Sequence, residues 1–160
     1  MKKELTSQYM ASLEMLKTSI EKCPDELWSD NSYKNIVWQV IYHTLHYTNL
    51  YLSEDEASFK PWEKHIENLH RFEHSHDTLQ NGIKPFYYAK SELIDYANVI
   101  AGQVASRIIE QDLQEQSGFE WLPMSKFELQ LYNLRHLQHH IGQVNERLRR
   151  HGITTMNWIG

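Results

Sequence analysis

Cysteine, glycine and proline are all scarce in this chain of 160 residues. The single cysteine, Cys23, excludes an internal disulfide framework and is typical of a protein from a reducing compartment. Only six glycines and four prolines are present, while 41% of the residues are hydrophobic and 23% are charged. This composition excludes fibrous and disordered proteins and indicates a globular chain long enough to bury a core without a stabilising metal.

Long apolar runs and an excess of positive charge are also lacking. No stretch approaches the roughly 18 apolar residues that a membrane span requires. The first residues, Met-Lys-Lys-Glu-Leu, are followed by polar ones and do not resemble a signal peptide. The net charge of −5 gives no general attraction to nucleic-acid phosphates. We therefore expect a cytoplasmic protein that binds neither nucleic acid nor membranes.

Four segments carry apolar residues with the period of a helix, and none shows the alternation of a strand. The first spans about 3–22, the second begins near Asn35 and ends before Ser53, the third spans about 88–110, and the fourth runs to about Arg150. This pattern predicts an all-α fold, a four-helix bundle formed by a single domain over residues 1–160. A long crossover, residues 53–87, connects the second and third helices.

The fourth helix has the clearest boundaries. Ser125 and Glu128 have the spacing of a capping box, in which each side chain accepts a hydrogen bond from a backbone N–H at the start of the helix. Gly152 stands where a glycine commonly ends a helix. The inward positions predicted for this helix are Leu134, Leu137, Ile141, Val144 and Leu148.

The crossover is too long for a plain connection in a compact domain, so we expect it to contain short helical turns or to serve function. It holds four histidines among acidic residues: His65, His70, His74 and His76. We interpret this part as a solvated segment in which His74 and His76 could chelate a metal ion adventitiously.

Histidine is unusually frequent, with ten copies, and three of them have informative positions. His136 and His140 are four residues apart, so they project from the same side of the fourth helix, at the edge of its apolar face. His139 points away from them. His43 lies on the predicted inward stripe of the second helix, and His46, one turn further, is an alternative to it.

Three imidazoles that lean into a core must be hydrogen-bonded or must share a cation, because burying them unpaired is costly. Three neutral ligands leave the charge of a divalent ion uncompensated and keep a position open, as in catalytic metal sites. Imidazole suits zinc, nickel, iron or copper, and the sequence does not choose among them. Gln143 and Asn133 are candidates to orient the ligands, although both can be ordinary polar residues of a helix.

Two motifs resemble the DinB superfamily of DinB/YfiT-like proteins. Residues 133–143, Asn-Leu-Arg-His-Leu-Gln-His-His-Ile-Gly-Gln, are similar to that family's fourth-helix motif, and residues 38–43, Trp-Gln-Val-Ile-Tyr-His, to its second-helix motif. The resemblance implies an up-down-down-up bundle, commonly a homodimer, with a divalent metal ion held by three histidines. Its ligands fall here on His43, His136 and His140.

The resemblance also supplies the functional hypotheses. Some members of the superfamily use the metal ion to activate a small thiol for transferase or isomerase chemistry. We therefore expect a metal-dependent enzyme, an S-transferase that uses a small thiol and acts on a small electrophilic substrate, in preference to a metal-dependent hydrolase. The alternative is a non-catalytic bundle that binds metal, dimerises or binds a partner through its aromatic crossover. Nucleic-acid binding is a third hypothesis, which the acidic charge opposes.

Overall fold

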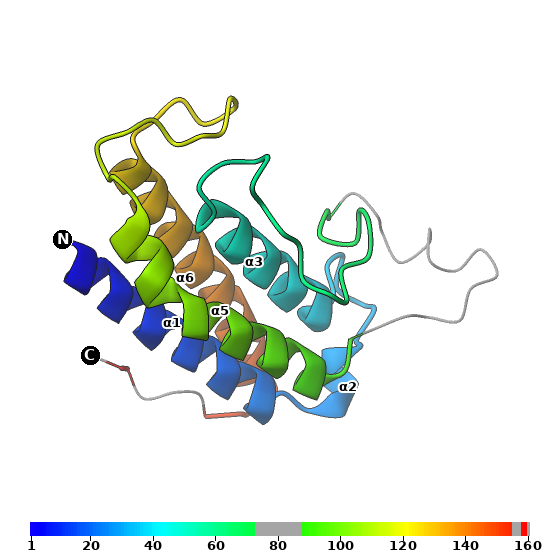
Figure 1. Ribbon diagram of the computed structural model, residues 1–160. Helices are drawn as coiled ribbons and strands as arrows, with labels where there is room; N and C mark the ends of the chain where they lie inside the picture. Colours follow the sequence, from blue (N-terminus) through cyan, green and yellow to red (C-terminus); the bar gives the residue numbers. More distant parts are fainter. Residues whose placement is uncertain (73–87, 155–157, 160) are drawn as a thin grey trace.

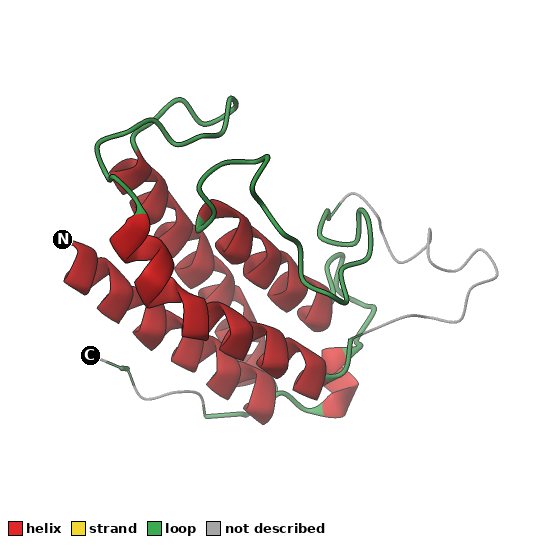
Figure 2. Ribbon diagram, in the orientation of Figure 1, coloured by secondary structure: helices red, strands yellow, loops and turns green. Residues whose placement is uncertain are grey.

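The computed structural model describes residues 1–72, 88–154, 158 and 159 (Figure 1). Within these residues the secondary structure is helical, apart from one isolated β-bridge between Gln116 and Ser125 (Figure 2). The helices are α1 (Lys2–Lys22), α2 (Asp25–Trp28), α3 (Val37–Tyr51), α5 (Lys90–Glu110) and α6 (Lys126–Arg150). The four long helices confirm the predicted helical segments. The short helix α2 was not predicted, because a single turn is too short to carry a periodic pattern.

The four long helices pack as a bundle in which α1 and α3 each contact both α5 and α6 (Figure 1). In α1, the Tyr9 hydroxyl donates a hydrogen bond to Gln130 near the start of α6. Further along both helices, Ser19 bonds Asn145, so α1 and α6 run in the same direction. Helices α3 and α5 run the opposite way. These directions match the up-down-down-up order that the resemblance implies.

The core forms where the periodicity predicts it. Apolar residues at helical spacing are buried along α1 and α5, and four of the five inward positions predicted for α6 are buried, whereas Leu134 is only partly buried. These buried residues are Leu5, Tyr9, Leu13, Leu16, Ile20, Leu93, Ala97, Ile100, Val104, Ile108, Leu137, Ile141, Val144 and Leu148. Removing such side chains from water is the main favourable contribution to folding.

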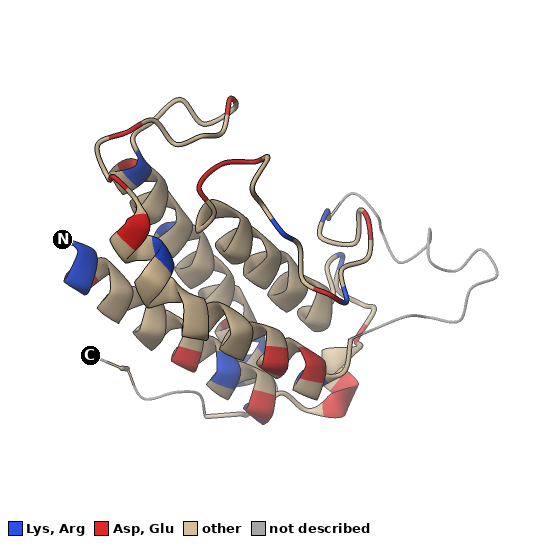
Figure 3. Ribbon diagram, in the orientation of Figure 1, with Lys and Arg blue, Asp and Glu red and all other residues tan. Residues whose placement is uncertain are grey.

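Helix α3 is buried on nearly all sides, and only His43 and Tyr47 are partly exposed along it. It carries no Asp, Glu, Lys or Arg (Figure 3). The prediction of one inward stripe was therefore wrong for this helix. Its second face is covered by residues 53–72 of the crossover, to which it is joined by a hydrogen bond between Tyr42 and His65 and by one from Gln39 to the backbone of Arg71.

The boundaries of α6 follow the local signals. The Ser125 side chain accepts a hydrogen bond from the Glu128 backbone N–H at 3.2 Å, which is one half of the predicted capping box. At the other end, Gly152 adopts a φ of +74°, in the left-handed region that favours glycine. No helix in the described part of the chain has an apolar stretch long enough to cross a membrane.

The described part of the crossover is built from short turns and not from a helix. Backbone hydrogen bonds link His65 to Trp62, Leu69 to Ile66, and Arg71 to Asn68. The segment therefore contains short turns, as expected, but the positive φ of Asn68 means that the turn from Ile66 to Leu69 is not helical. The remainder of the crossover, with His74 and His76, lies outside the described residues.

Candidate metal centre

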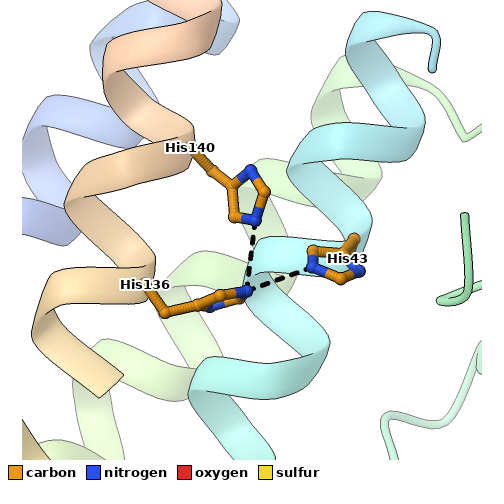
Figure 4. A group of neighbouring side chains, drawn as sticks. All are labelled: His43, His136 and His140. Atoms are coloured by element: carbon orange, nitrogen blue, oxygen red, sulfur yellow. Dashed lines mark hydrogen bonds between the residues drawn. The ribbon is translucent and has the colours of Figure 1, made fainter. Parts of the chain in front are cut away.

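Two neighbouring helices bring the predicted histidines together. His43 extends from α3, and His136 and His140 extend from α6, one turn apart, with their rings directed toward one another (Figure 4). Nε2 of His136 lies 3.1 Å from Nε2 of His43 and 3.1 Å from Nε2 of His140. We call these three residues the helix triad.

The spacing of the helix triad suits a single ion. With metal–nitrogen bonds of about 2.0–2.1 Å, the nitrogens of a tetrahedral zinc site lie about 3.3 Å apart. The two distances of 3.1 Å are close to that separation. Small ring movements would therefore bring the three nitrogens into a coordination sphere, with a further position left for another ligand.

Two of the three rings are oriented by hydrogen bonds at their other nitrogen. Nδ1 of His43 lies 2.8 Å from the His70 carbonyl oxygen, and Nδ1 of His140 lies 2.7 Å from Oε1 of Gln143. Because both partners are acceptors, each Nδ1 carries the proton and donates it. This leaves the Nε2 lone pairs free to bind an ion, which is the usual arrangement around metal-ligating histidines.

His136, the central member, is held differently. Its Nδ1 is buried and has no hydrogen-bond partner among the described residues. Its Nε2 is the atom that contacts both other rings. A neutral His136 has at most one Nε2–H to offer to the Nε2 lone pairs of His43 and His140, so at least one of these lone pairs has no hydrogen-bond donor. An ion among the three Nε2 atoms would remove that conflict.

Burial keeps the helix triad neutral. It lowers the pKa of His43 to about 4 and that of His136 to about 3, below the 6.5 of an exposed histidine. The pKa of His140 is also lowered, chiefly by burial, although its bond to Gln143 acts in the opposite direction. Histidine binds metals in its neutral form, so these rings are in the binding state at neutral pH.

Aromatic side chains surround the cluster. The ring of Phe72 stacks on His43 with 4.0 Å between centroids, and Tyr47 lies 4.7 Å from His43 and 5.7 Å from His136. Such walls exclude water and strengthen electrostatic interactions within the site.

The structure separates His46 from the helix triad, although the sequence left it as an alternative to His43. His46 instead lies with His65 and His70 of the crossover, and each of these three residues offers a nitrogen within 4.8 Å of the others. We call them the loop triad. Of the two candidates for orienting the ligands, Gln143 bonds His140, whereas Asn133 donates its amide hydrogen to the Thr48 carbonyl oxygen.

The interpretation of the crossover histidines as solvated was wrong for His65 and His70. The His65 side chain is only 15% exposed and His70 is buried. The reason is that Trp62 and Leu69, close to them in sequence, are buried against the bundle and hold the segment down. Those two apolar residues are the signal that could have predicted the burial of this segment, because large apolar side chains favour packing against a core over exposure to solvent.

In comparisons with protein-family models, curated proteins and solved structures, no match to this chain was found. Membership of the DinB superfamily therefore stays a prediction that rests on the two motifs. What the structure establishes is a helical bundle with two clusters of three histidines that could each hold a metal ion.

Proposed function

We propose that the protein binds a divalent metal ion at the helix triad and uses it to activate a small nucleophile. The observation that carries this proposal is the convergence of three Nε2 atoms from two helices, with distances of 3.1 Å and two Nδ1 atoms already hydrogen-bonded to acceptors. The motifs at residues 38–43 and 133–143 support the same assignment of ligands.

The chemistry follows from the donor set. Three neutral imidazoles leave the full charge of a divalent ion in place, and such an ion stabilises the deprotonated form of a bound thiol or water. His43, His136 and His140 would hold the ion, while Gln143 and the His70 carbonyl would fix the orientation of two of the rings. Zinc, nickel and iron all suit this donor set.

The binding step is tested by elemental analysis of protein purified without an affinity tag, followed by equilibrium titration with Zn²⁺ and Ni²⁺. We expect the His136→Ala variant to lose the ion held by the helix triad, with an affinity reduced by more than the roughly 10–100-fold that loss of an outer hydrogen-bond partner costs. His139→Ala is the matched control, because His139 lies on the same helix but is exposed. Equal metal content and affinity in wild type and His136→Ala would refute the proposal.

For the reaction, we propose transfer of a small thiol to an electrophilic carbon. The thiol proton goes to solvent, the sulfur forms a bond to the carbon, and the bond from that carbon to its leaving group breaks. The assay pairs low-molecular-weight thiols with an activated aryl halide and follows release of the halide. We expect turnover by the metal-loaded wild type and none by His140→Ala. Equal rates for the two proteins would contradict this proposal.

A second candidate is a structural ion that joins α3 to α6 without catalysis. The observation that favours it is Phe72, whose ring stacks on His43 and also lies 5.8 Å from the ring of His140. Cobalt-substituted protein distinguishes the candidates. If the ion accepts substrates, addition of a small thiol produces a thiolate-to-cobalt absorption band. If the ion is structural and closed off, the spectrum stays unchanged.

A further inference from the structure

A second group of imidazoles lies beside α3, one turn further along the helix than His43. The rings of His46 and His70 stack with 4.0 Å between centroids and 11° between planes. His65 adds a third ring, 5.2 Å from His46 and 5.6 Å from His70. The sequence did not predict that these three side chains lie together, and the proposed function makes no use of their rings.

The backbone that carries His65 and His70 is fixed to the bundle. Trp62 stacks on Tyr96 of α5 with 4.6 Å between ring centroids and an interplanar angle of 3°. Leu69 is buried beside the histidines. Between them Asn68 has a φ of +65°, a conformation that asparagine tolerates better than most residues and that turns the chain sharply. The two loop histidines therefore have defined positions opposite α3.

The ring nitrogens of the loop triad are only partly used by the protein. Nδ1 of His65 shares a hydrogen bond of 2.6 Å with the Tyr42 hydroxyl, so its Nε2 is the nitrogen available to a ligand. Nδ1 of His46, a residue only 5% exposed, is buried without a hydrogen-bond partner among the described residues. A buried polar atom in that state calls for an explanation, and an ion or a bound molecule would supply one.

The loop triad also borders open space. All three of its histidines line a pocket of about 610 Å³, together with Phe59, Glu67 and Trp121. The Glu67 carboxylate lies 3.6 Å from Nε2 of His65. An ion can therefore reach the three rings from solvent and find a negatively charged oxygen beside them.

We propose that His46, His65 and His70 form a second divalent metal site, separate from the helix triad, with Glu67 as a fourth ligand. Three imidazoles favour a borderline transition metal such as Zn²⁺ or Ni²⁺ over Mg²⁺ or Ca²⁺. The carboxylate distinguishes this site from the helix triad, because it neutralises part of the charge of the ion. This inference does not rest on the proposed function, since it involves other residues and another ion.

Binding at this site requires a larger movement than binding at the helix triad. Parallel rings cannot both direct a nitrogen lone pair at one ion, so His46 and His70 must tilt out of their stack. We therefore expect the loop triad to bind a metal ion more weakly than the helix triad does. Metal binding should also fix the orientation of its three rings.

The test is the stoichiometry of Zn²⁺ binding to the full chain after removal of metal, measured by competition with a chromophoric chelator. We expect two ions in the wild type, one in His65→Ala and one in His140→Ala, with the weaker ion absent from His65→Ala. We expect Glu67→Gln to retain two ions and to weaken the second. A double His74→Ala, His76→Ala variant is the control for adventitious chelation and should retain both ions.

The proposal is overturned if the wild type binds one ion that only His140→Ala removes, or if His65→Ala retains two ions. It is also overturned if the second ion disappears from the His74→Ala, His76→Ala control. A wild type that binds an ion at the loop triad but none at the helix triad would instead count against the proposed function. Failure of this proposal and failure of the proposed function are therefore distinguishable. Should His65→Ala fail to fold, imidazole ¹⁵N resonances of the wild type give the same answer, because metal-bound nitrogens of His46, His65 and His70 must shift on addition of the second equivalent.

Discussion

The two histidine triads use the same side chain but are held in different ways. The helix triad takes its members from α3 and α6, two packed helices, and its Nε2 atoms already lie 3.1 Å apart. The loop triad takes one member from α3 and two from a turn-rich segment, and its rings are stacked and not convergent. Helices fix the direction of a side chain as well as its position. The nitrogens of the helix triad are therefore already arranged for an ion, whereas those of the loop triad, two of which are held by turns, are not, although both triads use the same donor atoms.

His70 links the two sites. Its side chain belongs to the loop triad, while its carbonyl oxygen accepts the hydrogen bond that orients His43 in the helix triad. A change that displaces the segment 62–72 therefore disturbs both sites, whereas a change within α6 disturbs only one.

Acid should destabilise the metal-free protein through both triads. Burial lowers the pKa of His43 to about 4 and that of His46 and His136 to about 3, each from the 6.5 of an exposed histidine. The unfolded chain therefore binds more protons than the folded one between these values. Stability is fully present above about pH 6.5 and is lost as the pH falls toward 4. Urea unfolding in the presence of a chelator, repeated from pH 7.5 to 4.5, measures this loss.

The same experiment compares the triads directly. His43→Phe removes one buried imidazole from the helix triad, and His46→Phe removes one from the loop triad. Each variant should take up about one proton fewer on unfolding, which reduces the pH dependence by the same amount in both. A variant whose pH dependence equals that of the wild type would show that its histidine is already charged or solvated in the folded protein.

Trp62→Ala should detach the loop triad while the helices remain folded. Trp62 is 8% exposed and stacks on Tyr96, and replacing a buried tryptophan by alanine costs about 3–5 kcal/mol of unfolding free energy. Chemical denaturation measures the cost. Trp158→Ala is the matched control, since Trp158 is 79% exposed and its removal should change stability by no more than about 0.5 kcal/mol. Similar losses for both variants would mean that Trp62 does not anchor the segment.

Gln143→Leu should affect the helix triad alone. It removes the acceptor that holds Nδ1 of His140, and loss of such an outer partner reduces metal affinity by about 10–100-fold. Zn²⁺ titration should show the first ion weakened and the second unchanged. Gln103→Leu, at an exposed position of α5, serves as the control. Unchanged affinity in Gln143→Leu would exclude Gln143 from orienting the ligand.

The smallest effect is expected at Asn68, which shapes the turn between the loop histidines. Asn68→Val places a β-branched residue at a φ of +65° and should cost about 1–2 kcal/mol. Asn68→Gly keeps the conformation accessible and should leave the second metal ion in place. Thermal unfolding and Zn²⁺ titration of the pair check this, and equal behaviour of the two variants would show that the left-handed turn is unimportant.

The helices could be predicted from the sequence because they depend on local periodicity. Periodicity also brought His136 and His140 together, but it left His46 open as an alternative to His43, and only the resemblance to the DinB superfamily selected His43. The spacing of His136 and His140 fixes them on one side of α6, and the apolar pattern around His43 places it in the bundle. The loop triad was missed because His65 and His70 are brought to His46 by tertiary contacts of Trp62 and Leu69, which no local pattern reports. The near-complete burial of α3 was missed for the same reason, since the segment that covers it has no period of its own.

Metal binding at the helix triad is tested most directly by anomalous diffraction at the zinc absorption edge from crystals loaded with one and then with three equivalents of Zn²⁺. We predict a first peak about 2.1 Å from the three Nε2 atoms of His43, His136 and His140, and a second at the loop triad only at the higher loading. A first peak at any other position, or no peak at the helix triad, would contradict the assignment of His43, His136 and His140 as the stronger metal site.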